Sequence, residues 1–285
     1  MLFLFLAQVC VGINIVLYKG LISHINPVLI MTVRFIFASL FMSILLFRDI
    51  NQHHFRTSLD YKGWGILLVK GLGAGIAFNF ILLSGLHYTD ANSAGLITSL
   101  LPAVIICLNI LLFRQKLTSR MSLSLLVSVA GLVLINWGVA SNSGRNIIWG
   151  NFLVFIALIP DGLYYTLSKY YPLKMHSMLK VFWLNAVNVP FLVVIVFFLP
   201  KSLWGAITLH DLLLFLIIGI NSGLFFILWQ KGITNIDPAY AALSTAFMPV
   251  ATVILAWVIL NEGLTITKFI GMILVVFSIV VYARK

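Results

Sequence analysis

Residues 90–118 read DANSAGLITSLLPAVIICLNILLFRQKLT, and residues 237–265 read DPAYAALSTAFMPVATVILAWVILNEGLT. The second segment is a copy of the first, displaced by 147 residues along the chain. The positions that are identical in both copies include Asp90 with Asp237, Thr98 with Thr245, Pro102 with Pro249, Leu117 with Leu264 and Thr118 with Thr265. The chain therefore contains an internal duplication. Because both copies lie in strongly apolar sequence, they predict two homologous bundles of membrane helices and not a soluble solenoid.

The composition places the whole chain in a membrane. Hydrophobic residues make up 62% and charged residues 9% of the 285 residues, whereas about 25% of a soluble domain is charged. The apolar stretches are about 20 residues long, enough to cross roughly 30 Å of hydrocarbon as helices. We expect an all-α integral membrane protein with ten transmembrane helices, at about residues 2–19, 29–47, 64–85, 91–113, 121–139, 147–170, 178–199, 211–232, 238–260 and 265–283.

The basic residues set the expected orientation. The net charge is +11, but the cations form no single run, so nucleic acid is not an expected partner. If the N-terminus is cytoplasmic, the cytoplasmic side holds Arg48, Arg56, Lys62, Arg114, Lys116, Arg120, Lys169, Lys174, Lys180, Lys231, Arg284 and Lys285, and the other side holds Lys19, Arg145, Lys201 and Lys268. Cytoplasmic loops carry the excess of positive charge. The pattern predicts a protein of the cell (inner) membrane with both termini in the cytoplasm.

Each half contains an odd number of predicted spans. Residues 1–140 and 145–285 hold five spans each, separated by the polar stretch 141–144. A duplicated five-span unit must insert its second copy upside down, which gives two inverted-topology repeats. Such symmetry allows one site near the middle of the membrane to open to either face in turn. A duplicated scaffold or a channel is the alternative.

The ordered motifs of both halves resemble the EamA family of the drug/metabolite transporter superfamily over essentially the whole chain. They are Gly12-x-Asn14-x4-Lys19, Arg34-Phe35, Asp90-Ala91-Asn92-Ser93-Ala94, Leu101-Pro102, Asp237-Pro238-Ala239, Pro249 and Asn261-Glu262-Gly263-Leu264-Thr265. The resemblance implies ten helices in two inverted halves that move small metabolites, commonly amino acids, by alternating access. The chain departs from the family pattern at Gln115, where glutamate is usual, and at Val11, where tryptophan is common.

Asp161 is the acidic residue expected to carry function. It falls near the centre of the sixth span, in Pro160-Asp161-Gly162, where a carboxylate costs about 2.5–3.5 kcal/mol on insertion scales and should face a cavity or a partner. It could couple transport to protons or bind a substrate ammonium group; a structural salt bridge or kink is the alternative. Arg34 and Lys70 are possible partners. Arg34 could instead bind a substrate carboxylate, snorkel or pair with a helix end, and we expect Lys70 to snorkel to the interface.

Polar and aromatic residues within the spans are the candidates for lining a substrate cavity. With Asp161 they are Asn14, Asn79, Asn92, Thr98, Tyr164, Tyr165, Trp229, Tyr240 and Ser244. The mixture suits a small amphiphilic metabolite better than an inorganic ion, although aromatics in membranes also pack between helices or face lipid. Proline can kink a helix, so the candidate gating hinges are Pro102, Pro160 and Pro249; static kinks are the alternative.

Residues near the span ends are expected to organise the fold. Asp90 should cap the following helix, and Glu262 should anchor the turn between spans nine and ten. Gly71 and Gly75, at small-xxx-small spacing, predict close helix contact. The sequence has no histidine or cysteine spacing typical of a metal site, and it implies no cofactor.

The sequence therefore predicts a secondary transporter and not an enzyme, because HExxH and GxSxG motifs are missing from it. Its expected partners are the lipid bilayer and a small-molecule substrate, an amino acid or related compound that it exports by alternating access. An uptake or exchange carrier for a nucleoside, carboxylate or cofactor, and a scaffold that transports nothing, are the alternatives. The sequence leaves the oligomeric state open.

Overall fold

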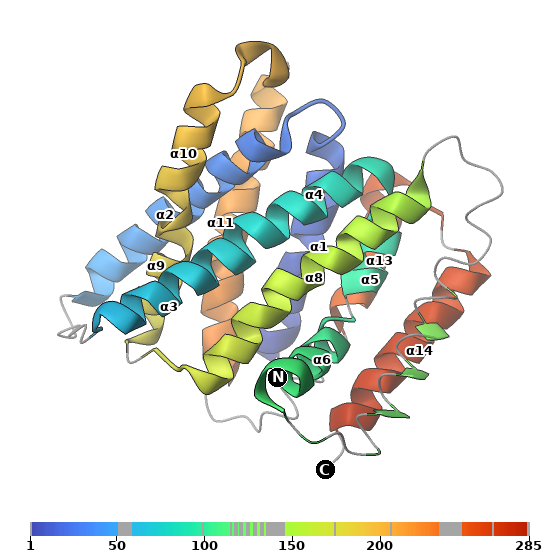
Figure 1. Cartoon of the computed structure of the whole chain (residues 1–285). Coiled ribbons are helices and arrows are strands. Elements are labelled where there is room, and N and C mark those ends of the chain that lie inside the picture. The colour runs from blue at the N-terminus through green and yellow to red at the C-terminus, as the bar shows by residue number, and fades with distance from the viewer. Residues whose placement is uncertain are drawn as a thin grey trace.

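The computed structural model describes residues 2–50, 59–98, 100–114, 146–173, 175–205, 207–233, 247–263 and 265–283, with scattered positions between 116 and 134. Within these ranges the chain forms helices and no strand (Figure 1). The elements are α1 Leu2–Leu21, α2 Pro27–Ile50, α3 Tyr61–Leu72, η1 Gly73–Ala77, α4 Phe78–Tyr88, α5 Ala91–Thr98, α6 Leu101–Phe113, α8 Ile147–Tyr170, α9 Ser177–Ala186, α10 Asn188–Phe198, η3 Lys201–Leu203, α11 Leu209–Ile233, α13 Phe247–Leu260 and α14 Ile266–Ala283.

Among the described residues, six helical segments are long and apolar enough to cross a membrane: Leu2–Leu21, Pro27–Phe47, Tyr61–Tyr88, Ile147–Ser168, Met178–Phe198 and Leu209–Trp229. They coincide with the predicted spans one, two, three, six, seven and eight. The third runs through α3, the π-helical η1 and α4, and the seventh is formed by α9 and α10. Most of predicted span five and the first part of span nine lie outside the described residues, so the arrangement of ten helices in two repeats stays a prediction.

Predicted span four is not one straight helix. It consists of α5 and α6, which are bent by 43° relative to each other. Pro102 lies in the first turn of α6, where proline is tolerated because the amide hydrogen it lacks would have no partner within the helix. Pro249 lies in the described part of α13, and Pro160 lies inside α8, which runs unbroken over 24 residues. Span four is thus bent where Pro102 stands, and the kink at Pro249 stays a prediction because the residues just before α13 lie outside the described part of the chain.

The two copies of the duplicated segment end their helices in the same way. α6 ends at Phe113 and α13 ends at Leu260, 147 residues later. The next residues, Arg114 and Asn261, both have left-handed backbones, with φ of 51° and 54°. A left-handed residue after the last turn is a common helix stop. The equivalent positions thus keep a shared local geometry despite different side chains.

Glycines let the central helices approach closely. α1 packs against α11, α13, α4 and α5, and a Cβ built on Gly12 would lie 3.0 Å from the backbone nitrogen of Thr252 in α13. A Cβ on Gly95 of α5 would lie 2.5 Å from the Thr252 side chain. Small residues of this kind allow backbones to pack tightly where no hydrophobic effect drives association. They bring α1, α5 and α13 together around one residue.

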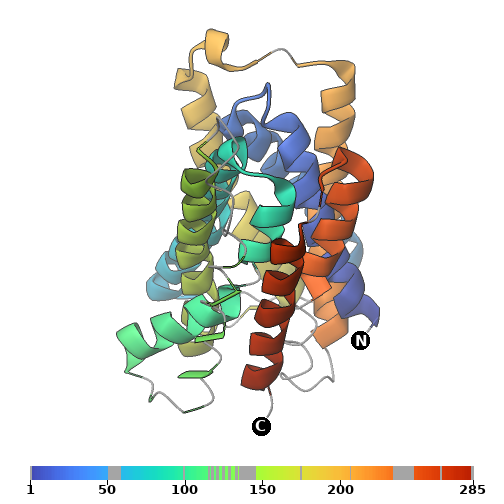
Figure 2. The same ribbon diagram turned by 90° about the vertical axis from the view of Figure 1, so that its right-hand side faces the viewer.

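The tilted helices α4 and α8 lie side by side (Figure 1). At their crossing, a Cβ built on Gly85 or on Gly150 would lie 2.9 Å from the carbonyl oxygen of the other glycine. Earlier in the same span, Gly71 and Gly75 face α9 and α10, which confirms the close helix contact predicted from their spacing. In Figure 2 the start of α1 and the end of α14 point toward the same end of the bundle.

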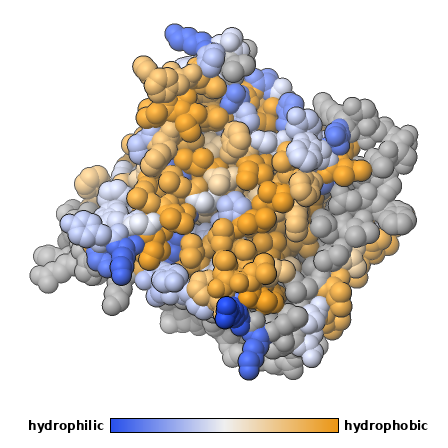
Figure 3. Space-filling view, viewed as in Figure 1, coloured by the Kyte–Doolittle hydropathy of each residue, from blue (hydrophilic) through white to orange (hydrophobic). Residues whose placement is uncertain are grey.

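The outer face of the bundle is apolar. Figure 3 shows hydrophobic side chains across the middle of the face that it presents. Large residues there are well exposed, for example Phe197 at 82% and Ile266 at 79%. A contiguous apolar surface of this extent is suited to lipid and not to water. The protein is a multi-pass membrane protein.

Candidate functional site

A cavity of about 690 Å³ lies inside the helix bundle. Its size is in the range of small-molecule sites, and its walls come from both ends of the sequence. The lining is mostly apolar, and its polar or aromatic members are Gln8, Asn14, Tyr18, Arg34, Phe35, Lys70, Phe78, Asn79, Thr98, Asp161, Tyr164, Tyr165, Asn185, Ser222, Phe225, Phe226 and Trp229. A pocket with few, placed polar groups can orient one end of a ligand while it buries the rest.

Arg34 is the centre of a polar network on one wall. Its Nε donates a hydrogen bond to Ser222 Oγ at 3.1 Å, and its Nη1 donates one to Asn79 Oδ1. Asn14 also donates to Ser222 Oγ, at 3.1 Å. The guanidinium carbon lies 4.8 Å from the centroid of the Phe35 ring, within cation–π range. These contacts from α1, α2, α4 and α11 hold Arg34 inside the bundle, so the alternative that it snorkels outward was wrong.

The polar side chains of this network are themselves held by further hydrogen bonds. Asn221 donates to the Cys10 carbonyl at 2.7 Å and to Asn14 Oδ1 at 2.8 Å. Ser222 donates to the Ile218 carbonyl at 2.7 Å, and Asn79 donates to the Gly75 carbonyl at 2.7 Å. Side chains whose own hydrogen bonds are made have little freedom to rotate, so the network is preorganised.

Asp161 lines the cavity from the middle of α8. The next turn carries Tyr164 and Tyr165, whose rings meet edge to face with centroids 5.1 Å apart. Within the described part of the chain, no cation lies within 4.0 Å of the Asp161 carboxylate. Neither of its two possible partners, Arg34 and Lys70, pairs with it. A carboxylate within a span is costly, and here it faces the cavity.

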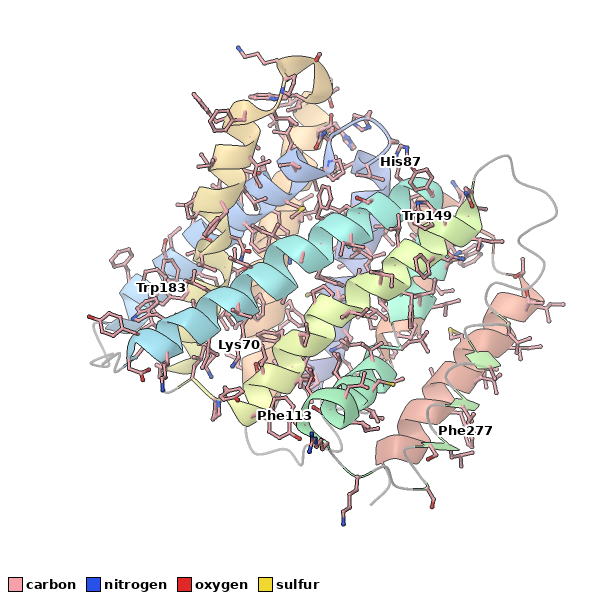
Figure 4. All side chains as sticks on the ribbon, in the orientation of Figure 1. Lys70, His87, Phe113, Trp149, Trp183 and Phe277 are labelled. Carbon is pink, nitrogen blue, oxygen red and sulfur yellow. The ribbon has the colours of Figure 1, made fainter. Side chains whose placement is uncertain are left out.

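Lys70 is buried and does not snorkel. Only 2% of its surface is exposed, and its Nζ donates to the Tyr171 carbonyl at 2.7 Å, so the side chain reaches from α3 to the end of α8 (Figure 4). The ammonium caps the final turn of α8, where carbonyl groups have no helical partner. The predicted snorkelling was wrong because this acceptor is 101 residues away in the sequence.

Lys19 and Asp90 hold the turn between α4 and α5, which lies outside the cavity. Lys19, in the last turn of α1, donates hydrogen bonds to the carbonyls of Leu86, at 2.6 Å, and Thr89. A cation at these positions matches the partial negative charge at the end of α4. Asp90 accepts from the backbone nitrogen of Ser93 at 2.7 Å, which confirms the predicted cap.

Glu262 binds the same turn from the other half of the chain. Its carboxylate accepts from the backbone N–H groups of Ala91 at 3.0 Å and Asn92 at 2.9 Å, at the start of α5. An anion there matches the positive end of a helix. We had expected Glu262 to anchor its own turn, but the amides it binds lie 171 and 170 residues away. Lys19 and Glu262 together form what we call the charge clamp.

Burial raises the pKa of the Glu262 carboxyl, and the nearby Asp90 raises it further. The hydrogen bonds from the two backbone amides and the charge of Lys19 lower it, without cancelling the loss of solvation. The carboxyl therefore titrates at higher pH than an exposed glutamate. Glu262 is therefore a partly desolvated carboxyl group and not a solvated surface charge.

The cavity brings together seven of the ten predicted cavity residues. Asn14, Asn79, Thr98, Asp161, Tyr164, Tyr165 and Trp229 line it. Asn92 does not: it is buried at the start of α5, beside Glu262. Tyr240 and Ser244 lie outside the described residues. Among the described residues there is no cluster of three histidine, cysteine or acidic side chains that could hold a metal ion.

Sequence reasoning missed Gln8, Tyr18 and Asn185 as lining residues. A signal for two of them was present in α1, since positions 8, 11, 14, 15 and 18 share one helical face. Asn14 was singled out as a polar residue within a span, but Gln8, nearly two turns before it, and Tyr18, one turn after it, were not.

Comparisons with known proteins give one consistent result. The sequence model of the EamA-like transporter family matches residues 1–137 and 148–284. The uncharacterized transporter YetK of Bacillus subtilis is 29% identical, over 98% of this chain and 85% of its own length. An uncharacterized transporter of Archaeoglobus fulgidus is 23% identical, over 96% of this chain and 95% of its own. A crystal structure that is 18% identical shares the fold, with a TM-score of 0.66 over 99% of this chain and 95% of the other.

Proposed function

The chain belongs to the EamA-like transporter family, and from that premise we propose that it is a secondary active transporter that exports a small organic metabolite by alternating access. The substrate is an amino acid or a related compound. The observation that carries this proposal is the cavity of about 690 Å³, in which Asp161 and Arg34 both lie and do not pair with each other. Opposite charges on a mostly apolar lining suit a zwitterion with an apolar body better than an inorganic ion.

Asp161 is the proposed coupling group. Its carboxylate has no cation partner among the described residues, so a proton or the ammonium group of a substrate can neutralise it. Either ligand reduces the cost of a charge in the middle of a span. Binding there would link occupancy of the cavity to the conformation of α8.

The charge clamp supports alternating access. Lys19 comes from the first half of the sequence and Glu262 from the second, and both hold the turn between α4 and α5. We expect two inverted five-helix repeats that rock against each other, with the clamp closed in one conformation and released in the other. Because its contacts are to backbone groups, it can break without disturbing the side-chain network of the cavity.

The test begins with a thermal-shift screen of purified protein against amino acids, nucleosides and carboxylates, because a ligand that binds the folded state raises its melting temperature. Counterflow of the labelled hit is then measured in proteoliposomes. Transport should occur with wild type and be lost, or lose its pH dependence, in Asp161→Asn. The matched control is Asp60→Asn, because Asp60 caps α3 through Gly63 at 2.8 Å and asparagine caps equally well.

The outcomes separate the alternatives. If Asp161→Asn transports at the wild-type rate and keeps the wild-type pH dependence, the coupling role of Asp161 is refuted. A ligand that binds and shows no counterflow favours a scaffold. A nucleoside or a carboxylate as the transported hit favours the other carrier classes.

A further inference from the structure

Tyr18 has a buried hydroxyl that the fold does not explain. The side chain lines the cavity from α1, one turn after Asn14, and 3% of the residue is exposed. Within the described part of the chain, the hydroxyl has no hydrogen-bond partner. A buried donor without a partner lowers stability, and most buried polar groups have one. A phenylalanine would fill the same space without this penalty.

Arg34 lies next to Tyr18, with its guanidinium carbon 5.9 Å from the tyrosine ring centroid. Its Nε and Nη1 donate to Ser222 and Asn79, and its remaining N–H groups have no partner among the residues described. Both partners are neutral, and no described carboxylate lies within 4.0 Å of the guanidinium. The positive charge therefore lacks a counter-ion among the described residues.

The two observations point to the same missing group. An arginine held by hydrogen bonds at Nε and Nη1 keeps further N–H donors for a planar anion, and guanidinium matches a carboxylate in a bidentate way. A tyrosine hydroxyl can donate one further hydrogen bond to the same anion. Asp161 cannot fill this role, because it lies beyond ion-pair distance of Arg34.

We propose that Tyr18 and Arg34 form an anion subsite that binds the carboxylate of the transported molecule. This inference rests on the proposed transport function and narrows it: the substrate carries a carboxylate, and Tyr18 is a residue that determines specificity. The carboxylate lies on the wall formed by α1, α2, α4 and α11. The rest of the molecule extends along the apolar lining.

The test compares Tyr18→Phe with wild type by thermal shift, using a panel of aliphatic and aromatic carboxylates, each with its primary amide. Carboxylates should bind wild type more tightly than their amides. Tyr18→Phe should weaken carboxylate binding roughly tenfold or more, the effect of losing a hydrogen bond to a charged group. Amide binding should change less than twofold. Tyr88→Phe is the matched control, since Tyr88 is 39% exposed and does not line the cavity.

A second readout requires no ligand. Because the Tyr18 hydroxyl has no partner, ligand-free Tyr18→Phe should melt at the same temperature as wild type or higher, whereas loss of a structural hydrogen bond would lower it. Three results overturn the subsite: carboxylates that bind no better than amides, an equal loss for both in Tyr18→Phe, or a lower ligand-free melting temperature. Counterflow of an amide or amine in both proteins would refute the subsite and leave the transport function standing.

Discussion

The closest contact between span three and span seven can be tested with one methyl group. A Cβ built on Gly75 would lie 2.2 Å from Asn188 Oδ1 and 2.5 Å from Asn188 Cγ. A Cβ on Gly73, two residues earlier in η1, would meet the carbonyl oxygen of Pro160 at an ordinary 3.7 Å. Gly75→Ala and Gly73→Ala therefore add the same methyl group to the same helix, and only the first creates a clash.

The expected magnitudes follow from that geometry. Alanine gains about 0.5–1 kcal/mol over glycine in a helix, and this gain should appear for Gly73→Ala. In Gly75→Ala, overpacking costs roughly 1–3 kcal/mol. Moving Asn188 also threatens its hydrogen bond to the Leu184 carbonyl, 2.7 Å long, worth about 0.5–1.5 kcal/mol. The two variants should differ by roughly 2–4 kcal/mol, with Gly75→Ala the less stable.

The assay is thermal unfolding of both variants in one detergent, followed by tryptophan fluorescence. Gly75→Ala should melt several degrees below Gly73→Ala, and adding Asn188→Ala should remove most of that difference by opening the space. The reasoning is refuted if Gly75→Ala is at least as stable as Gly73→Ala, or if Asn188→Ala leaves the gap unchanged.

Three further predictions concern other contacts. The folded state binds the Glu262 proton more tightly than the unfolded chain, so protonation of this carboxyl stabilises the fold fully below the ordinary pKa of glutamate, and the stabilisation declines as pH rises through the raised pKa. The melting temperature of Glu262→Gln should lack this pH-dependent decline. Identical pH profiles of melting temperature for wild type and Glu262→Gln would contradict the prediction. Lys19→Met should cost roughly 1–3 kcal/mol through two lost charged hydrogen bonds, measured by thermal unfolding, and an unchanged melting temperature would count against the clamp. Gly95→Ala should lower the melting temperature, because its Cβ would lie 2.5 Å from the Thr252 side chain. Gly65→Ala should raise the melting temperature slightly, because a Cβ there has nothing within 4 Å. The reverse order would show that α5 and α13 are not in close contact.

Much of the helix pattern and part of the cavity could be predicted because both depend on local composition. A run of about 20 apolar residues must form a helix in lipid, and polar residues such as Asn14 and Asp161 stand out against it. The form of the bend at Pro102 could not be predicted, because proline can kink a helix interior and can equally well start a new helix. Its sequence position does not distinguish the two cases.

Long-range partners could not be predicted. The acceptor of Lys70 is the carbonyl of Tyr171, and the donors to Glu262 are amides of the other half. Backbone groups leave no mark in the sequence, since every residue carries them. Tyr18 was detectable by its helical spacing from Asn14, but the missing partner of its hydroxyl is visible only in three dimensions.

Alternating access is the central claim, and cysteine accessibility tests it most directly. Ala74 lines the cavity, so Ala74→Cys would be made after the free cysteines Cys10 and Cys107 are replaced by alanine, and labelled with a membrane-impermeant maleimide in right-side-out and in inside-out vesicles. We predict labelling from both faces, with the ratio of the two rates shifted by ligand. Labelling from one face alone, with and without ligand, would contradict the account.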